Sequence, residues 1–200
     1  MKCVLSSIKN DSRNCFFCFI IFLIGDKVIC KSLKPYPKVE KLCPNEEYAK
    51  LLLEDYAGCT SEDTAIHLYL YQSLILREQN EELSKILEEI SKVEMHHLKL
   101  LGETIGALGV KPVFGSSRDE WLIPWNASCV EYTIDLNEML IADIAREEGA
   151  IKKYREHIAS IDDEFIKALL ERIIEDELVH LNIFYYFLQN LVVKNISCDG

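Results

Sequence analysis

Apolar residues recur at every third or fourth position along most of the chain beyond residue 45, a spacing that predicts amphipathic helices. No segment shows the sustained alternation of apolar and polar residues that is typical of a half-buried strand. The pattern divides this part of the chain into one short helix and four longer ones, over about 45–58, 61–78, 81–108, 131–159 and 162–191. The sequence therefore predicts an all-α chain.

Short polar segments and helix-capping residues mark the connections between these helices. Thr60 and Ser61 are both good N-caps for the first long helix. The connections near residues 77–81 and 160–163 are short, and short connections make neighbouring helices antiparallel. The connection over 109–130 reaches about 70 Å when extended, which is enough to cross a whole bundle. We therefore expect two antiparallel helical hairpins joined by a long crossover, with a short preceding helix.

The two expected hairpins share a motif. In each, the pattern E-x-x-A-I-x-x-Y on the first helix is followed by E-x-x-H-L on the second, 32 residues later in one hairpin and 30 in the other. A single E-x-x-H is weak evidence, but two copies that each follow a matched partner are hard to obtain by chance. The repeated charged and aromatic positions are Glu62, Tyr69, Glu94 and His97 in the first hairpin, and Glu147, Tyr154, Glu177 and His180 in the second.

Helical geometry brings the repeated glutamates to one level of a bundle. Each pair lies about equally far from the turn of its own hairpin, roughly 24 Å at 1.5 Å per residue. Glu and His three positions apart share a helix face, and the rest of that face is apolar on the second helix of each hairpin. A buried carboxylate without a partner is costly, whereas four carboxylates and two neutral imidazoles balance two divalent ions. A buried two-metal centre is therefore expected.

This arrangement resembles the ferritin-like superfamily, whose di-iron and di-manganese members take a glutamate from each of two helices and E-x-x-H from the other two. The resemblance covers residues 45–190 and is closest to manganese-catalase-like and rubrerythrin-like bacterial proteins. It implies a ferritin-like four-helix bundle and a cofactor of two metal ions, iron or manganese. It also implies the ligands: Glu94 and Glu177 bridge the ions, Glu62 and Glu147 bind one ion each, and His97 and His180 are terminal ligands.

Three further residues are candidates for a role beside these ligands. Tyr69 and Tyr154 lie two turns after their glutamates and could hydrogen-bond to the centre or to a bound oxidant. The alternative for each is a core tyrosine that is satisfied elsewhere. Asp176 could orient a ligand histidine from across the bundle, but Val93 occupies the equivalent place on the other helix, and an exposed aspartate is the alternative.

The remaining histidines and the cysteines are not expected to bind metal. His67 and His157 have no glutamate three positions before them, and His96 is turned about 100° around the helix from the ligand beside it. Cys15 and Cys18 form a C-x-x-C pair without a second copy, so no rubredoxin-like electron-transfer module is expected. Eight cysteines scattered through a helix-rich chain do not resemble a disulfide framework, and we expect reduced thiols in a cytoplasmic protein.

Residues 1–33 differ from the rest of the chain. Basic residues precede a short apolar run over 15–24, as in a signal peptide, but no small-x-small cleavage site follows. The run is shorter than the about 20 residues that are needed to span a bilayer. We therefore expect residues 1–33 to be an extension outside the core, residues 34–200 to form one metal-binding domain, and no membrane association.

The formal net charge of −11 argues against a nucleic-acid partner, because an acidic surface repels phosphate. A carboxylate-bridged pair of redox metals exchanges two electrons, which suits hydrogen peroxide or dioxygen. We expect a homo-oligomeric oxidoreductase that disproportionates peroxide with manganese, or reduces peroxide or dioxygen with iron and a separate electron donor protein. The alternatives are a ferritin- or bacterioferritin-type protein for iron oxidation and storage, and a bundle that has become a scaffold without metal.

Overall fold

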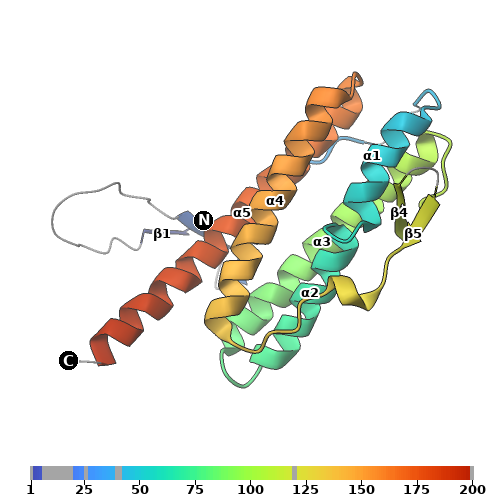
Figure 1. Ribbon diagram of the computed structural model, residues 1–200. Helices are drawn as coiled ribbons and strands as arrows, with labels where there is room; N and C mark the ends of the chain where they lie inside the picture. The colour runs from blue at the N-terminus through green and yellow to red at the C-terminus, as the bar shows by residue number, and fades with distance from the viewer. Residues whose placement is uncertain (1, 6–19, 25–26, 39–41, 119–120, 199–200) are drawn as a thin grey trace.

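The structure is a computed structural model that describes residues 2–5, 20–24, 27–38, 42–118 and 121–198. The four long helices form a bundle in which α2 packs against α3 and α4 packs against α5, while the shorter α1 lies at one end (Figure 1). The predicted all-α class and the two helical hairpins are therefore confirmed. The helices are α1 (Glu46–Ala57), α2 (Glu62–Leu76), α3 (Glu81–Ala107), α4 (Leu136–Ser160) and α5 (Glu164–Cys198).

Side-chain caps fix the residues at which the bundle helices begin. Ser61 and Asn80 each accept a hydrogen bond from the backbone N–H three residues later, at the starts of α2 and α3. Asp135 does the same for α4, so this helix begins later than the expected residue 131. The carboxylate of Asp163 caps α5 by accepting from a backbone N–H of its first turn. These caps satisfy donors that the helices themselves leave free.

Two apolar clusters fill the bundle, one on each side of the level at which the repeated glutamates lie. On α3, Leu83, Leu87 and Ile90 belong to one cluster, whereas Leu101 and Ile105 belong to the other. The apolar face of α1 covers this second cluster. Burying one such side chain stabilises the fold by about 1.5–3 kcal/mol. The two clusters hold the four helices together and leave a polar layer between them.

The connection between the two hairpins contains a small β-hairpin, so the expectation of a chain without strands is wrong here. At Gly115 the two strands come so close that a Cβ atom would lie 2.5 Å from the carbonyl oxygen of Ile123, which only glycine avoids. Strands of four residues are too short for an alternating pattern to be recognised. The elements are β4 (Gly115–Arg118), its antiparallel partner β5 (Trp121–Pro124) and the 3-10 turn η1 (Ala127–Cys129).

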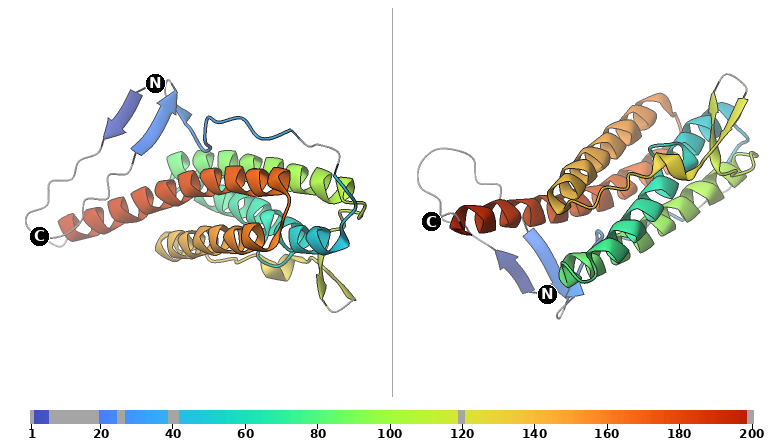
Figure 2. Two further views of the ribbon diagram at one scale, coloured as in Figure 1. Left: turned by 90° about the horizontal axis from the view of Figure 1, so that it is seen from above. Right: turned by 60° about the horizontal axis from the view of Figure 1, so that its bottom comes forward.

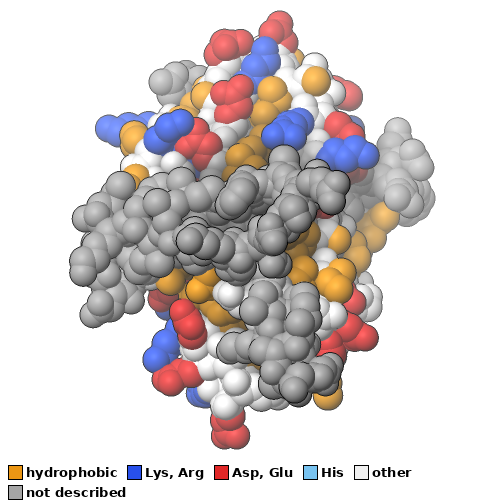
Figure 3. Space-filling model, turned by 90° about the vertical axis from the view of Figure 1, so that its left-hand side faces the viewer, with side chains coloured by type: hydrophobic (Ala, Val, Ile, Leu, Met, Phe, Trp, Pro, Cys, Tyr) orange, Lys and Arg blue, Asp and Glu red, His pale blue; other side chains and the backbone are white. Residues whose placement is uncertain are grey.

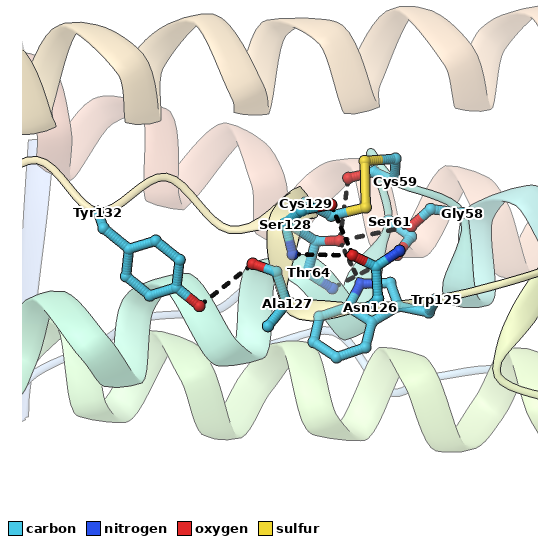
Figure 4. The surroundings of a disulfide bond; sticks show 10 residues. All are labelled: Gly58, Cys59, Ser61, Thr64, Trp125, Asn126, Ala127, Ser128, Cys129 and Tyr132. Carbon is cyan, nitrogen blue, oxygen red and sulfur yellow. Dashed lines mark hydrogen bonds between the residues drawn. A yellow bond between two sulfur atoms is a disulfide. The ribbon is translucent and has the colours of Figure 1, made fainter.

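A disulfide joins Cys59 to Cys129, with the two Cα atoms 5.1 Å apart (Figure 4). The expectation that all cysteines are reduced is therefore wrong for this pair. Beside the disulfide, Nε1 of Trp125 donates a hydrogen bond of 2.8 Å to Oγ1 of Thr64. The two contacts tie the crossover to the start of α2, and this pairing depends on the fold rather than on any spacing of cysteines.

We expect the double substitution C59S/C129S to lower the free energy of unfolding by about 2–4 kcal/mol, because the bridge closes a long loop in the unfolded chain. Urea unfolding in non-reducing buffer measures the effect. Cys43→Ser, which removes an exposed free thiol, is the matched control and should leave the midpoint unchanged. A double variant with the stability of the parent chain would contradict the prediction.

The described part of the N-terminal region includes three short antiparallel strands, and from the last of them the chain runs past α3 and α5 toward α1 (Figure 2). The apolar run predicted over 15–24 lies partly outside the described residues. Cys30 is buried in a core cluster, so core contacts begin before residue 33, and the division of the chain at that residue stays a prediction. The strands are β1 (Lys2–Leu5), β2 (Ile20–Ile24) and β3 (Lys27–Val28).

Charged groups are divided between the surface and the bundle interior. On the face in Figure 3, acidic and basic side chains are interspersed among the described residues. Inside, eight of the described Asp and Glu residues are buried, against Arg172 as the one buried basic residue. The interior therefore holds more acidic side chains than arginine and lysine side chains. Among the described residues, no helix is long and apolar enough to cross a membrane.

Candidate metal centre

The six residues that the repeat singles out meet inside the bundle. They come from all four long helices, and none of them is more than 4% exposed. In each helix, polar residues interrupt the apolar stripe at the same height in the bundle. Because the helices pack side by side, these polar side chains meet at one level. The contributions are Glu62 from α2, Glu94 and His97 from α3, Glu147 from α4, and Glu177 and His180 from α5.

The six side chains form two overlapping groups that could each hold a metal ion. In each group, the candidate ligand atoms all lie within 4.8 Å of one another. Glu94 and Glu177 belong to both groups, as carboxylates that bridge two ions would. The first group is completed by Glu62 and His97, and the second by Glu147 and His180.

Each histidine directs its Nδ1 atom toward the two shared carboxylates. Nδ1 of His97 lies 2.8 Å from Oε2 of Glu94 and 3.3 Å from Oε1 of Glu177. Nδ1 of His180 lies 3.0 Å from Oε1 of Glu94 and 3.0 Å from Oε2 of Glu177. The two imidazoles therefore present equivalent nitrogens to the same carboxylates.

The electrostatics of this cluster are those of a site that needs cations. Burial, and then the two shared carboxylates, raise the pKa of Glu62 and of Glu147 well above the ordinary value. Burial acts to lower the pKa of His97 and His180, but the surrounding carboxylates outweigh it and raise both. Oε1 of Glu94 is buried and accepts no hydrogen bond within the described chain. In the metal-free protein, bound protons neutralise part of the negative charge of this cluster. Its carboxylate and imidazole donors suit iron or manganese.

Tyr69 and Tyr154 connect the two halves of the bundle crosswise. Tyr69 on α2 donates its hydroxyl to Oε1 of Glu147 on α4, and Tyr154 on α4 donates to Oε1 of Glu62 on α2. Burial raises the pKa of both phenols, so both remain donors at neutral pH. The structure therefore places both tyrosines against candidate ligands, and their part in a reaction stays a prediction.

Asp176 lies directly behind His97. Its Oδ2 atom is 2.9 Å from Nε2 of His97, across the bundle from α5 to α3. Its Oδ1 atom accepts a hydrogen bond of 2.7 Å from Nη1 of Arg172. Burial acts to raise the pKa of Asp176, but the hydrogen bond and charge of His97, together with hydrogen bonds from Tyr36 and Arg172, outweigh it and lower the pKa to about 2. The ionised carboxylate orients the ring so that Nδ1 faces the cluster.

Two groups from the N-terminal region also reach the histidines, and the sequence analysis did not find them. The hydroxyl of Tyr36 lies 3.3 Å from Nε2 of His97 and donates to Oδ2 of Asp176. Nε2 of His180 donates to the carbonyl oxygen of Cys30 over 2.8 Å. A backbone carbonyl carries no sequence signal, because any residue supplies one.

The other three histidines have partners outside the cluster. Nδ1 of His157 lies 2.7 Å from Oδ2 of Asp55, and the ring of His67 stacks on Trp125 at 4.6 Å between centroids. His96 packs edge-on against a tyrosine ring. None of them joins either group of candidate ligands among the described residues, and the expectation that they do not bind metal stays a prediction.

A small pocket between α2 and α4 opens onto the carboxylates. Its volume of about 20 Å³ has room for about one water-sized molecule. Its lining includes all four glutamates, both tyrosines and neither histidine. Ala65 and Ala150, the alanines of the repeated motif, also line it, and their small side chains leave the space open. The cluster is therefore open to a small molecule from the tyrosine side.

Comparison with known proteins gives a consistent result. The family model described as Rubrerythrin matches residues 56–188. A curated relative from Clostridium acetobutylicum, "Probable manganese catalase", is 27% identical over 168 residues, which cover 74% of this chain and 72% of the relative. The crystal structure of KatB, a manganese catalase from Anabaena, is 29% identical with a TM-score of 0.71, covering 80% of this chain and 79% of that one.

A bacterioferritin, BfrA of Mycobacterium tuberculosis, also resembles the chain. Its TM-score is 0.63 at 23% identity, and the match covers 75% of this chain and 89% of that one. At this identity the likeness concerns the fold. The bundle is therefore a ferritin-like four-helix bundle, as the sequence predicts.

Proposed function

Because the chain belongs to the rubrerythrin family, we propose that it is an oxidoreductase whose centre of two metal ions, iron or manganese, acts on hydrogen peroxide. The proposal rests on the two overlapping ligand groups that share Glu94 and Glu177. When bound, two redox-active ions joined by carboxylates supply or accept the two electrons that peroxide chemistry requires. The manganese catalases at 27–29% identity favour peroxide over dioxygen as the substrate.

The protein side chains have three tasks in this proposal. Their carboxylates and imidazoles hold the ions, and the apolar clusters on both sides exclude bulk water. The small pocket favours a reactant of few atoms, such as peroxide, over larger molecules. Tyr69 and Tyr154 hold protons at their phenol oxygens, next to the pocket, and orient Glu147 and Glu62 by hydrogen bonds.

Disproportionation is the reaction that the relatives favour. One peroxide molecule gives up two electrons and two protons and becomes dioxygen, and a second accepts them and becomes two water molecules. This cycle needs no outside reductant. Reduction of peroxide at an iron centre would instead need two electrons from a separate donor protein.

An oxygen electrode tests the proposal directly. The metal-free chain, the chain loaded with Mn²⁺ and the chain loaded with Fe²⁺ are each given hydrogen peroxide, and peroxide consumption is followed in parallel with and without reduced rubredoxin as donor. One dioxygen released per two peroxides consumed supports disproportionation. The proposal is wrong if neither loaded form evolves dioxygen or consumes peroxide with the donor.

Iron oxidation and storage is the second candidate function, and the bacterioferritin likeness supports it through the fold. Storage requires a hollow shell of many subunits, whereas an enzyme works as a small homo-oligomer. Size-exclusion chromatography of the full chain separates the two. A very large assembly that retains many iron atoms per chain would favour storage.

We expect Ala150→Leu to lower peroxide turnover at least about tenfold while leaving two metal ions bound. The larger side chain fills the pocket on the tyrosine side without touching the histidine side. Gly149→Ala, at an exposed neighbouring position with open space around it, is the matched control. Turnover is measured with the oxygen electrode and metal content by elemental analysis. Unchanged turnover would show that reactants enter by another route.

We expect the affinity for Mn²⁺ to increase as the pH rises above about 6.5, the ordinary histidine value. The carboxylates raise the pKa of His97 and His180 in the metal-free chain, so an incoming ion must displace protons from both rings. Each displaced proton makes the affinity rise about tenfold per pH unit below the raised pKa. Competition with a chelating indicator at several pH values measures this dependence, and a pH-independent affinity would contradict it.

A further inference from the structure

Residues 30–36, here called the strap, lie along α3 and α5 on the histidine side of the centre (Figure 2). One buried arginine on α5 holds them there. Nε of Arg172 donates to the carbonyl oxygen of Lys34 over 2.9 Å, and Nη2 donates to that of Ser32 over 3.0 Å. The guanidinium also lies 4.1 Å from the centre of the Tyr36 ring. The strap is therefore anchored by directional contacts with the bundle.

The strap contacts the outer nitrogen of both candidate ligand histidines. The carbonyl oxygen of Cys30 accepts from Nε2 of His180, and a carbonyl oxygen can only accept. Nε2 of His180 must therefore carry the proton, which leaves Nδ1 to bind an ion. At His97 the strap acts through Asp176, whose carboxylate accepts from the backbone N–H of Ser32 over 2.6 Å and from the Tyr36 hydroxyl.

The repeat leaves His180 without a carboxylate like the one that supports His97, and the strap supplies an acceptor there. Asp176 on α5 supports His97 on α3, and the position related to it by the repeat is Val93 on α3. A valine side chain cannot accept a hydrogen bond from His180. The Cys30 carbonyl supplies the missing acceptor, and Cys30 and Val93 line the same surface pocket.

The two histidines are therefore supported by different chemical groups. His97 donates to an ionised carboxylate, whereas His180 donates to a neutral carbonyl. An imidazole that donates to a carboxylate is the stronger metal ligand. The Arg172 guanidinium contacts Oδ1 of Asp176, while His97 contacts Oδ2, so the arginine weakens this difference without cancelling it.

We propose that the strap is part of the metal centre because it supports both ligand histidines, and that the charge of Asp176 behind His97 makes the two positions unequal, so that an ion held by Glu62 and His97 is bound more tightly than an ion held by Glu147 and His180. This inference rests on the proposed two-metal function. It assigns a positioning role to the backbone of Cys30 and to Arg172, Asp176 and Tyr36. It also places essential contacts within the first 33 residues, which the sequence pattern assigned to an extension.

Calorimetric titration of the metal-free full chain with Mn²⁺ tests the proposal. The parent chain should bind two ions with separate affinities. Asp176→Asn keeps an acceptor for His97 but removes its charge, so the tighter affinity should fall about 10–100-fold and approach the weaker one. Arg172→Lys keeps the charge but cannot hold the strap at several points, so both affinities should fall.

Glu171→Gln is the matched control, because Glu171 is an exposed carboxylate on the same helix α5. It should leave both affinities unchanged. The thermal midpoint of each metal-free variant shows whether it folds. Two ions of equal affinity in the parent chain, or equal weakening of both by Asp176→Asn, would overturn the inference and leave the two-metal function standing. A parent chain that binds neither Mn²⁺ nor Fe²⁺ would overturn both.

Discussion

Replacing Glu94 by glutamine should remove at least one of the two metal ions. Peroxide turnover should fall further than it does when a hydrogen-bond partner of a ligand is lost, a change that costs about 10–100-fold. Glu94 belongs to both ligand groups, and its side chain is only 1% exposed. A glutamine amide has nearly the same shape but no negative charge, so it cannot neutralise two cations. The effect is measured as metal content per chain and as oxygen evolution on the same preparation.

The metal-free form of this variant separates loss of metal from loss of fold. Glu94 lies between the two histidines, whose charges and hydrogen bonds outweigh burial and lower its pKa. Glu94→Gln removes this buried ion-pair partner, so the metal-free midpoint should fall, and a single cooperative transition shows that the variant still folds. Glu103→Gln is the control on the same helix α3. The exposed carboxylate of Glu103 lies 3.7 Å from Nζ of Lys99, so this substitution should change neither metal content nor turnover. A Glu94→Gln chain with two ions and full turnover would remove Glu94 from the centre.

Saturating the metal-free chain with Mn²⁺ should raise its thermal midpoint by about 8–16 °C for each tightly bound ion. An ion at 1,000 times its dissociation constant stabilises the folded state by about 4.1 kcal/mol. For a chain of this length, each kcal/mol corresponds to about 2–4 °C. Circular dichroism with and without Mn²⁺ measures the shift, and the double variant Glu94→Gln with Glu177→Gln should lose it.

This stabilisation should grow with pH. Glu62 and Glu147 have folded-state pKa values above those of the unfolded chain, so the folded metal-free state binds protons more strongly. The contribution of these two groups to stability is therefore fully present below the ordinary glutamate value of about 4.3 and is lost as the pH rises through the raised values. Bound cations replace these protons, so the loaded chain should lose less stability. An equal shift at pH 6 and pH 8 would contradict this account.

The sequence by itself indicated the helices, their pairing and the six residues that the fold brings together as candidate ligands. Apolar residues at helical spacing indicate the buried face of each helix. Glu94 and His97 lie on that face of α3, at positions where the pattern would otherwise place apolar residues. The repeat then gave the matching residues in the second hairpin, Glu177 and His180. The buried faces depend on neighbours within a few helical turns, and the repeat depends on matching spacings along the chain; a single sequence displays both directly.

Only the tertiary structure decided the contacts between distant segments. Cys59 and Cys129 pair because the crossover lies against the start of α2, and the carbonyl oxygen of Cys30 reaches His180, a residue 150 positions away. Asp176 showed its partner only once α3 and α5 lay side by side, since the sequence equally allowed an exposed aspartate. Such contacts involve backbone atoms or common side chains, and their free energy depends on the path of the whole chain rather than on local spacing.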